Sequence, residues 1–173
     1  FEGGGIKGLS YTGALRCLEE RGIRIKSVAG TSVGSLIASL IAAGYKSHEL
    51  EEIIERIDFE AIWPKPKKKG IKRTLEVVKK RYIYEIDPLE KTLNRLLTEK
   101  GKTTFGDMKV GNTYRLKIIV TNIKNKDILV VPDHLRHYGI DPDKFEISKA
   151  VCMSSSIPLV YPPYKINSFS FVD

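Results

Sequence analysis

The 173-residue chain is 42% hydrophobic and 29% charged, a composition that excludes intrinsic disorder and predicts one globular domain over residues 1–173. Its longest apolar stretch, residues 35–44, is far shorter than the roughly 20 residues of a transmembrane helix, and no basic-then-apolar leader indicates a signal peptide. The formal net charge of +8 predicts either an anionic partner or a solvated basic surface.

Residues 1–43 alternate between strands, glycine turns and helices. They predict, in order, a strand end at 1–2, a glycine turn at 3–8, a helix over 9–20, a strand over 23–29, a second turn at 30–34 and a buried helix over 35–43. Two strands joined through a helix, each followed by a glycine turn, predict an α/β fold with a central, mostly parallel sheet.

Two helices with capped starts are predicted next. We expect Ser47 to cap a helix over 47–57. We expect Asp87 to cap a second helix, with Pro88 at its first position and Glu90 placed to reach back.

The last third of the chain predicts strands around one short helix. The predicted elements are a hairpin of strands 116–121 and 128–131, a helix over 147–153, and a final strand over 169–172 that ends at Asp173.

The positive charge is concentrated in one lysine-rich stretch. Its members are Lys65, Lys67, Lys68, Lys69, Lys72 and Arg73. Anionic lipid head groups fit such a cluster, each nearby Lys or Arg contributing about 1 kcal/mol. Nucleic-acid phosphates fit it too, although little aromatic interleaving supports that partner. A solvated loop is the plain alternative.

Two cysteines, Cys17 and Cys152, sit among apolar residues in segments that look helical. We expect both to be buried free thiols rather than disulfide partners. A chain that is not a disulfide scaffold favours a reducing compartment.

The strongest local motif is Gly30-Thr31-Ser32-Val33-Gly34. It fits the G-x-S-x-G turn between a strand and a helix, which is so tight that glycines must flank the nucleophilic serine. The predicted strand and buried helix on either side supply that context. Ser32 would then stand at the positive end of the helix, where a developing alkoxide is favoured.

The glycine run Gly3-Gly4-Gly5-Ile6-Lys7-Gly8 predicts an anion cradle beside a helix start. A P-loop is excluded because Leu9-Ser10, rather than lysine and a hydroxyl residue, follows the last glycine. A dinucleotide fingerprint fits the glycine spacing, but the next strand lacks the acid at its end. A phosphate and the oxyanion of an acyl-transfer intermediate both fit such a cradle, and the weakened cofactor patterns favour the oxyanion.

A serine nucleophile also needs a base. Order along the chain allows a triad of Ser32, an acid such as Asp107 or Asp127, and His134. Asp173, at the end of an apolar strand, is better placed than any histidine.

In this order, the glycine run, the serine turn and the late aspartate resemble patatin-like phospholipases over the whole chain. Gly3 to Gly8 resembles the oxyanion motif, with Lys7 as its basic residue, and Asp173 resembles the aspartate of the Asp-Gly motif, although the chain stops before that glycine. Val33 stands where alanine is usual. The segment from Ala150 through the Ser154-Ser155-Ser156-Ile157-Pro158 run resembles the part that precedes the aspartate.

The resemblance implies a three-layer α/β/α patatin-like fold and a catalytic domain trimmed at both ends. It implies a lipid acyl hydrolase of phospholipase A or lysophospholipase type that uses a Ser32–Asp173 dyad without histidine. The implied oxyanion hole comprises Gly3, Gly4, Gly5, Lys7 and Gly8. No metal or cofactor is implied. The implied substrate is a phospholipid or other acyl-ester lipid at a membrane surface, met by a cytoplasmic protein that binds membranes peripherally.

Two other classes remain open on the sequence. One is a lipid-binding domain that keeps the fold without the chemistry. The other is a nucleic-acid-binding module that uses the lysine cluster.

Overall fold

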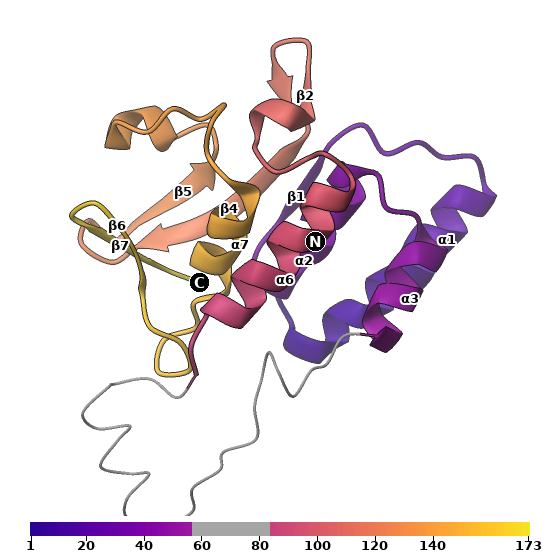
Figure 1. The fold of residues 1–173 in the computed structure, drawn as a ribbon, viewed down its shortest axis with the longest axis horizontal. Helices are drawn as coiled ribbons and strands as arrows, with labels where there is room; N and C mark the ends of the chain where they lie inside the picture. The colour runs from indigo at the N-terminus through magenta and orange to yellow at the C-terminus, as the bar shows by residue number, and fades with distance from the viewer. Residues whose placement is uncertain (57–83) are drawn as a thin grey trace, which may run out of the picture.

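The computed structural model describes residues 1–56 and 84–173 (Figure 1). The first part holds, in order, the 3-10 helix η1 (Gly5–Ser10), α1 (Tyr11–Glu20), β1 (Val28–Gly30), α2 (Val33–Ala43) and α3 (Ser47–Arg56). The second part holds, in order, α6 (Asp87–Glu99), η2 (Gly106–Met108), β2 (Lys109–Val110), β3 (Thr113–Tyr114), β4 (Leu116–Asn122), β5 (Asp127–Val131), η3 (Leu135–Tyr138), α7 (Ile147–Ser155), β6 (Tyr164–Ile166) and β7 (Phe169–Val172). The predicted α/β class is confirmed.

The main sheet is built around β4, which pairs with β1, β5 and β7. The β1–β4 pair is parallel, whereas β4–β5, β4–β7 and β6–β7 are antiparallel. The described sheet is therefore mixed, where we expected a mostly parallel one. Short turns join β4 to β5 and β6 to β7, and such turns can connect only antiparallel neighbours.

β1 and β7 lie along the same edge of β4. Ile118 faces Gly30 on one side and Val131 on the other, and Thr121 faces Val172 and Ile128 in the same way. Because β5 occupies one edge throughout, β1 and β7 share the opposite edge. One runs parallel to β4 and the other antiparallel, so their carboxyl ends point toward each other.

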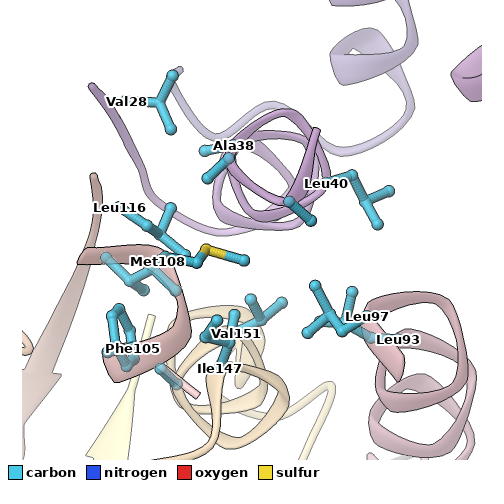
Figure 2. Close-up of a cluster of buried hydrophobic side chains, with 14 of the residues drawn as sticks. Val28, Ala38, Leu40, Leu93, Leu97, Phe105, Met108, Leu116, Ile147 and Val151 are labelled. Carbon is cyan, nitrogen blue, oxygen red and sulfur yellow. The ribbon is translucent and has the colours of Figure 1, made fainter. Parts of the chain in front are cut away.

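The core lies between the sheet and helices α2, α6 and α7 (Figure 2). Leu116 from β4, Ala38 and Leu40 from α2, and Ile147 and Val151 from α7 are all buried there. As the sequence predicted, α2 is buried on nearly every side. A helix held this firmly provides a rigid support for whatever lies at its first residue.

Several local predictions need correction. The predicted strand over 23–29 is strand only from Val28, where it pairs with β4 from Leu116 onward; the chain just before β4 forms β3 and pairs with β2 instead. Residues 1–2 are not assigned as strand, although the Phe1 amino group donates to Ala29 O at 2.7 Å and Phe1 O accepts from Thr31 N at 3.2 Å. These two bonds have the pattern of a parallel strand pair, with Phe1 placed beside β1.

The predicted helix caps and one cysteine also differ. Ser47 donates its hydroxyl to Glu19 at 2.6 Å instead of capping α3, and the backbone start of α6 has Ile86 at its cap with no side-chain bond. Cys152 is buried and free as expected, but Cys17 is exposed because it lies on the outer side of α1.

Glu49 ties the start of α3 to the end of α6. Its carboxylate accepts the Lys46 N–H at 2.8 Å and the Lys100 ammonium at 2.7 Å. The bond to Lys100, followed by the bond to Lys46, lowers the pKa of Glu49 from its ordinary value. A lowered carboxyl pKa stabilises the fold at neutral pH, and this stabilisation is lost as the pH falls through the lowered pKa.

We therefore expect Glu49→Gln to lower the free energy of unfolding by about 0.5 kcal/mol at pH 7, because both partners are about a third exposed and screened by solvent. The difference from wild type should shrink below about pH 4.3. Urea denaturation at several pH values measures it. Glu52→Gln is the matched control, since the Glu52–Arg56 pair is largely exposed and should contribute nothing measurable. An equal penalty at pH 7 and pH 3 would contradict the electrostatic explanation.

Candidate active site

Ser32 lies at the junction of β1 and α2, in a backbone conformation that ordinary residues avoid. Its φ is 50° and its ψ is −133°. Such conformations cost on the order of 1–3 kcal/mol and persist only where neighbouring groups enforce them. The residue is also buried, with 5% of its surface exposed. A strained serine at a strand-to-helix turn is the arrangement that the G-x-S-x-G motif predicts.

Close backbone contacts enforce this turn. A Cβ atom on Gly30 would lie 2.3 Å from Gly34 O, and one on Gly34 would lie 2.4 Å from Phe1 O. Neither backbone neighbour can yield, so only glycine fits at both positions. Ser35, in the first turn of α2, also holds the serine turn. Its N–H and its hydroxyl both donate to Ser32 O, at 2.8 and 2.6 Å.

Asp173 reaches this turn because the ends of β1 and β7 face each other. Its Oδ1 lies 3.4 Å from the Thr31 hydroxyl, and its N–H donates to Ser156 O at 3.2 Å. Thr31 immediately precedes Ser32, so the carboxylate lies next to the serine turn. The structure thus brings together two predicted site residues from opposite ends of the chain.

The N-terminal glycine run packs against the same turn. A Cβ atom on Gly3 would lie 3.0 Å from Ser32 Cβ, and one on Gly8 would lie 2.6 Å from Val33 Cγ1. The backbone N–H groups of Gly3 and Gly4 donate in none of the backbone bonds of the described residues. A glycine run packed against the serine turn, close to the start of helix α2, forms an environment suited to negative charge.

The histidine alternative finds no geometry to support it. His134 Nδ1 accepts from Val130 N at 3.2 Å, and its ring stacks on His137. The Asp107 carboxylate accepts two backbone N–H groups of its own loop, from Thr104 and Thr103, and the bond from Thr104 foremost lowers its pKa. Both side chains are therefore engaged locally rather than directed to Ser32.

One buried residue at the site had no role assigned from sequence. Ser154, from α7, accepts the backbone N–H of Ser32 at 2.9 Å and donates its hydroxyl to Ile119 O at 2.6 Å. The sequence showed only that Ser154 lies in a segment preceding the aspartate. The local sequence around Ser154 does not predict a bond to the Ser32 turn, which lies 122 residues earlier in the chain.

Other predictions concern different parts of the molecule. The basic cluster formed by Lys65, Lys67, Lys68, Lys69, Lys72 and Arg73 lies outside the described residues. Within residues 1–56 and 84–173, none of the helices has both the length and the apolar character to cross a membrane.

The arrangement defines an α/β protein with a strained serine turn, a glycine cradle and a nearby carboxylate. A profile of the Patatin-like phospholipase family matches residues 1–173, so the chain belongs to this family.

Proteins with similar sequences are longer than this chain. Uncharacterized protein YqhO of Bacillus subtilis is 39% identical over 97% of this chain and 58% of its own length. Lysophospholipase NTE1 of Candida glabrata is 49% identical over 55 residues, which are 32% of this chain and 3% of that protein. The chain thus spans only about half the length of two such relatives: it covers 58% of YqhO and 52% of the protein R571 of Acanthamoeba polyphaga mimivirus.

Solved structures share the fold at lower identity. ExoU from the type III secretion system of Pseudomonas aeruginosa, solved in complex with SpcU, superposes with a TM-score of 0.61 at 21% identity over 91% of this chain and 38% of that chain. VipD of Legionella pneumophila gives a TM-score of 0.59 at 17% identity over 99% of this chain and 44% of that chain. These likenesses confirm the expected three-layer α/β/α patatin-like fold.

The close approach at Gly34 leads to a stability prediction. Gly34→Ala should lower the free energy of unfolding by about 1–3 kcal/mol, because the added methyl group overlaps the backbone of Phe1 and Glu2. Thermal or urea denaturation measures the change. Gly13→Ala is the control: an added Cβ there meets nothing within 4 Å on α1, so it should stabilise by about 0.5–1 kcal/mol. Similar effects at both positions would contradict the packing described for the turn.

Proposed function

We propose that the protein hydrolyses fatty-acyl esters of lipids, in the manner of a phospholipase A or lysophospholipase, with Ser32 as nucleophile and Asp173 as its base. One observation supports this above the others: the strained Ser32 turn meets the Asp173 carboxylate through the 3.4 Å contact with Thr31. Family membership supports the reaction class, and the geometry supports the two residues.

In the first half of the proposed reaction, Ser32 Oγ attacks the ester carbonyl carbon while its proton passes to the Asp173 carboxylate. The carbonyl electron pair moves to oxygen and forms a tetrahedral oxyanion. Backbone N–H groups of Gly3, Gly4 and Gly5 then hold this oxyanion. Collapse of the intermediate releases the alcohol, which takes the proton from Asp173, and leaves Ser32 acylated.

In the second half, water attacks the acyl-enzyme and gives its proton to Asp173. The second tetrahedral intermediate collapses to free fatty acid and a Ser32 alkoxide, which takes the proton from Asp173 and so restores both groups. A carboxylate is a weak base toward an alcohol, so the reaction depends strongly on the oxyanion hole. One such donor typically contributes about 2.7–4 kcal/mol to the transition state.

An apolar loop beside the site supports a lipid substrate. Leu159 is 73% exposed and Ile157 is 40% exposed, directly after the Ser156 carbonyl that holds the Asp173 amide. Leu159 also has a positive φ of 70°, which is uncommon for a residue with a Cβ. We propose that this loop contacts the acyl region of a lipid surface.

The basic cluster formed by Lys65, Lys67, Lys68, Lys69, Lys72 and Arg73 would add contacts to anionic head groups in the same proposal. A cytoplasmic protein that binds membranes peripherally fits both features.

Ser32→Ala should reduce ester hydrolysis by at least about 10³-fold, because no other group in the proposal forms the acyl-enzyme. Product release from a defined phospholipid mixture and covalent labelling by a fluorophosphonate both measure it. Ser39→Ala, which removes a buried hydroxyl from the same helix, should leave both unchanged. Persistent hydrolysis or labelling in purified Ser32→Ala protein would end the nucleophile assignment, whereas a wild-type protein that binds lipid without labelling would be a binding domain.

Asp173→Asn should lower kcat by about 10²–10⁴-fold, since an amide of the same shape cannot take the serine proton. Steady-state kinetics on the full-length protein give the value. Asp127→Asn, at an exposed strand start, should have no effect. A normal rate in Asp173→Asn would transfer the base to another group.

Leu159→Asn should weaken binding to phosphatidylcholine vesicles while leaving hydrolysis of a soluble short-chain ester unchanged, because it removes exposed apolar surface without touching the reacting groups. Vesicle flotation and a soluble-ester assay separate the two effects. Ile128→Asn removes a side chain of comparable exposure, 69%, on β5 and serves as the control. Equal loss of vesicle binding in both variants would remove any special role for the loop.

A further inference from the structure

The last turn of α7 is attached to both halves of the site. Ser154 accepts the amide of Ser32, and Ser156 O accepts the amide of Asp173. We propose that Ser154 is a positioning residue, which holds the nucleophile in its reactive conformation and at a fixed separation from the base. This inference rests on the proposed roles of Ser32 and Asp173.

The direction of the Ser154 hydroxyl follows from its two bonds. A hydroxyl has one proton to donate, and Ser154 gives it to Ile119 O at 2.6 Å. The lone pairs of Oγ are therefore left to accept the Ser32 N–H at 2.9 Å. Ser154 has no exposed surface, so water does not compete for either bond.

The position of Ile119 makes this chain of bonds significant. Gly30 of β1 faces Ile118, and Val172 of β7 faces Thr121, both along the same edge of β4. Ile119 therefore lies where the carboxyl ends of β1 and β7 approach each other. Through Ser154, the Ser32 amide is bonded to the β4 residue located between the nucleophile and the base.

Ser156 completes the connection from the same turn. Its hydroxyl donates to Cys152 O at 2.8 Å, which fixes the end of the helix, while its carbonyl accepts from Asp173 N at 3.2 Å. The amides of Ser32 and Asp173 are thus bonded to residues only two positions apart in the chain. Because one helix end holds the amides of both Ser32 and Asp173, it limits how far the nucleophile and the base can separate.

The role assigned to Ser154 is indirect, because its only proton goes to Ile119 O and its oxygen accepts the Ser32 N–H, which leaves no proton to donate to a substrate. Removing it leaves the Ser32 N–H buried without this acceptor, next to a backbone conformation that is already strained. Ser32 is then free to relax away from the attack geometry. Misplacement of a reacting group on the order of 1 Å is enough to lower a rate by about 100-fold.

The test compares Ser154→Ala with Ser148→Ala in the full-length protein. Ser148 also lies on α7, is fully buried, and has no hydrogen-bond partner for its hydroxyl among the described residues. The two substitutions therefore make the same chemical deletion on one helix, but only the first touches the site. Fluorophosphonate titration counts reactive sites, so kcat is obtained per folded, reactive molecule, and thermal denaturation records stability.

We expect Ser154→Ala to keep a full titration end point but to label more slowly, with kcat about 10- to 100-fold lower and KM nearly unchanged. Ser154→Thr, which keeps the hydroxyl, should recover most of kcat, and Ser148→Ala should match wild type. A wild-type kcat per titrated site in Ser154→Ala, or a loss equal to that in Ser148→Ala, overturns the positioning role alone. Absence of labelling at Ser32 in the wild-type protein overturns the nucleophile assignment itself.

Discussion

The site depends on one feature of the sheet: β1 and β7 approach each other end to end along a single edge of β4. In a purely parallel sheet, the carboxyl ends of neighbouring strands lie side by side, about 4.8 Å apart for each strand step. Here β7 runs antiparallel to β4 while β1 runs parallel to it, so their carboxyl ends converge on Ile119. The residue that follows β7 and the residues that follow β1 must then share the same small space.

The serine turn beside this convergence is strained, and the rest of the fold offsets the cost of that strain. Ser32 occupies a strained conformation, and its turn admits no Cβ at Gly30 or Gly34. The offset comes from α2, whose residues are almost all buried between the sheet and its neighbouring helices, and from the backbone bonds of Phe1 to β1. The strain is thus supported by a core that has little freedom to relax. The N-terminal glycine run packs against the turn, with Gly3 next to Ser32 and Gly8 next to Val33.

Much of this was predictable from local patterns. The glycine spacing around Ser32, the apolar helix that follows, the 116–131 hairpin and the last strand ending at Asp173 are all set by neighbours within a few residues. The mixed character of the sheet was missed because the pairing of β7 with β4 is a long-range choice that no local pattern encodes. Ser47 and Asp87 were expected to cap helices, but tertiary contacts, such as Ser47 with Glu19, override that local preference. The sequence places Ser154 in the segment that precedes the aspartate, but its bond to the Ser32 amide follows only from the three-dimensional packing.

The central claim is therefore spatial, and a crystal structure of the full-length protein with a fluorophosphonate bound tests it most directly. The account predicts phosphorus bonded to Ser32 Oγ, a phosphoryl oxygen directed at the amides of the glycine run, and the Asp173 carboxylate within about 2.6–3.2 Å of Ser32 Oγ or one water molecule away. An adduct on another residue, or a carboxylate far from Oγ with the glycine amides turned away, would contradict it.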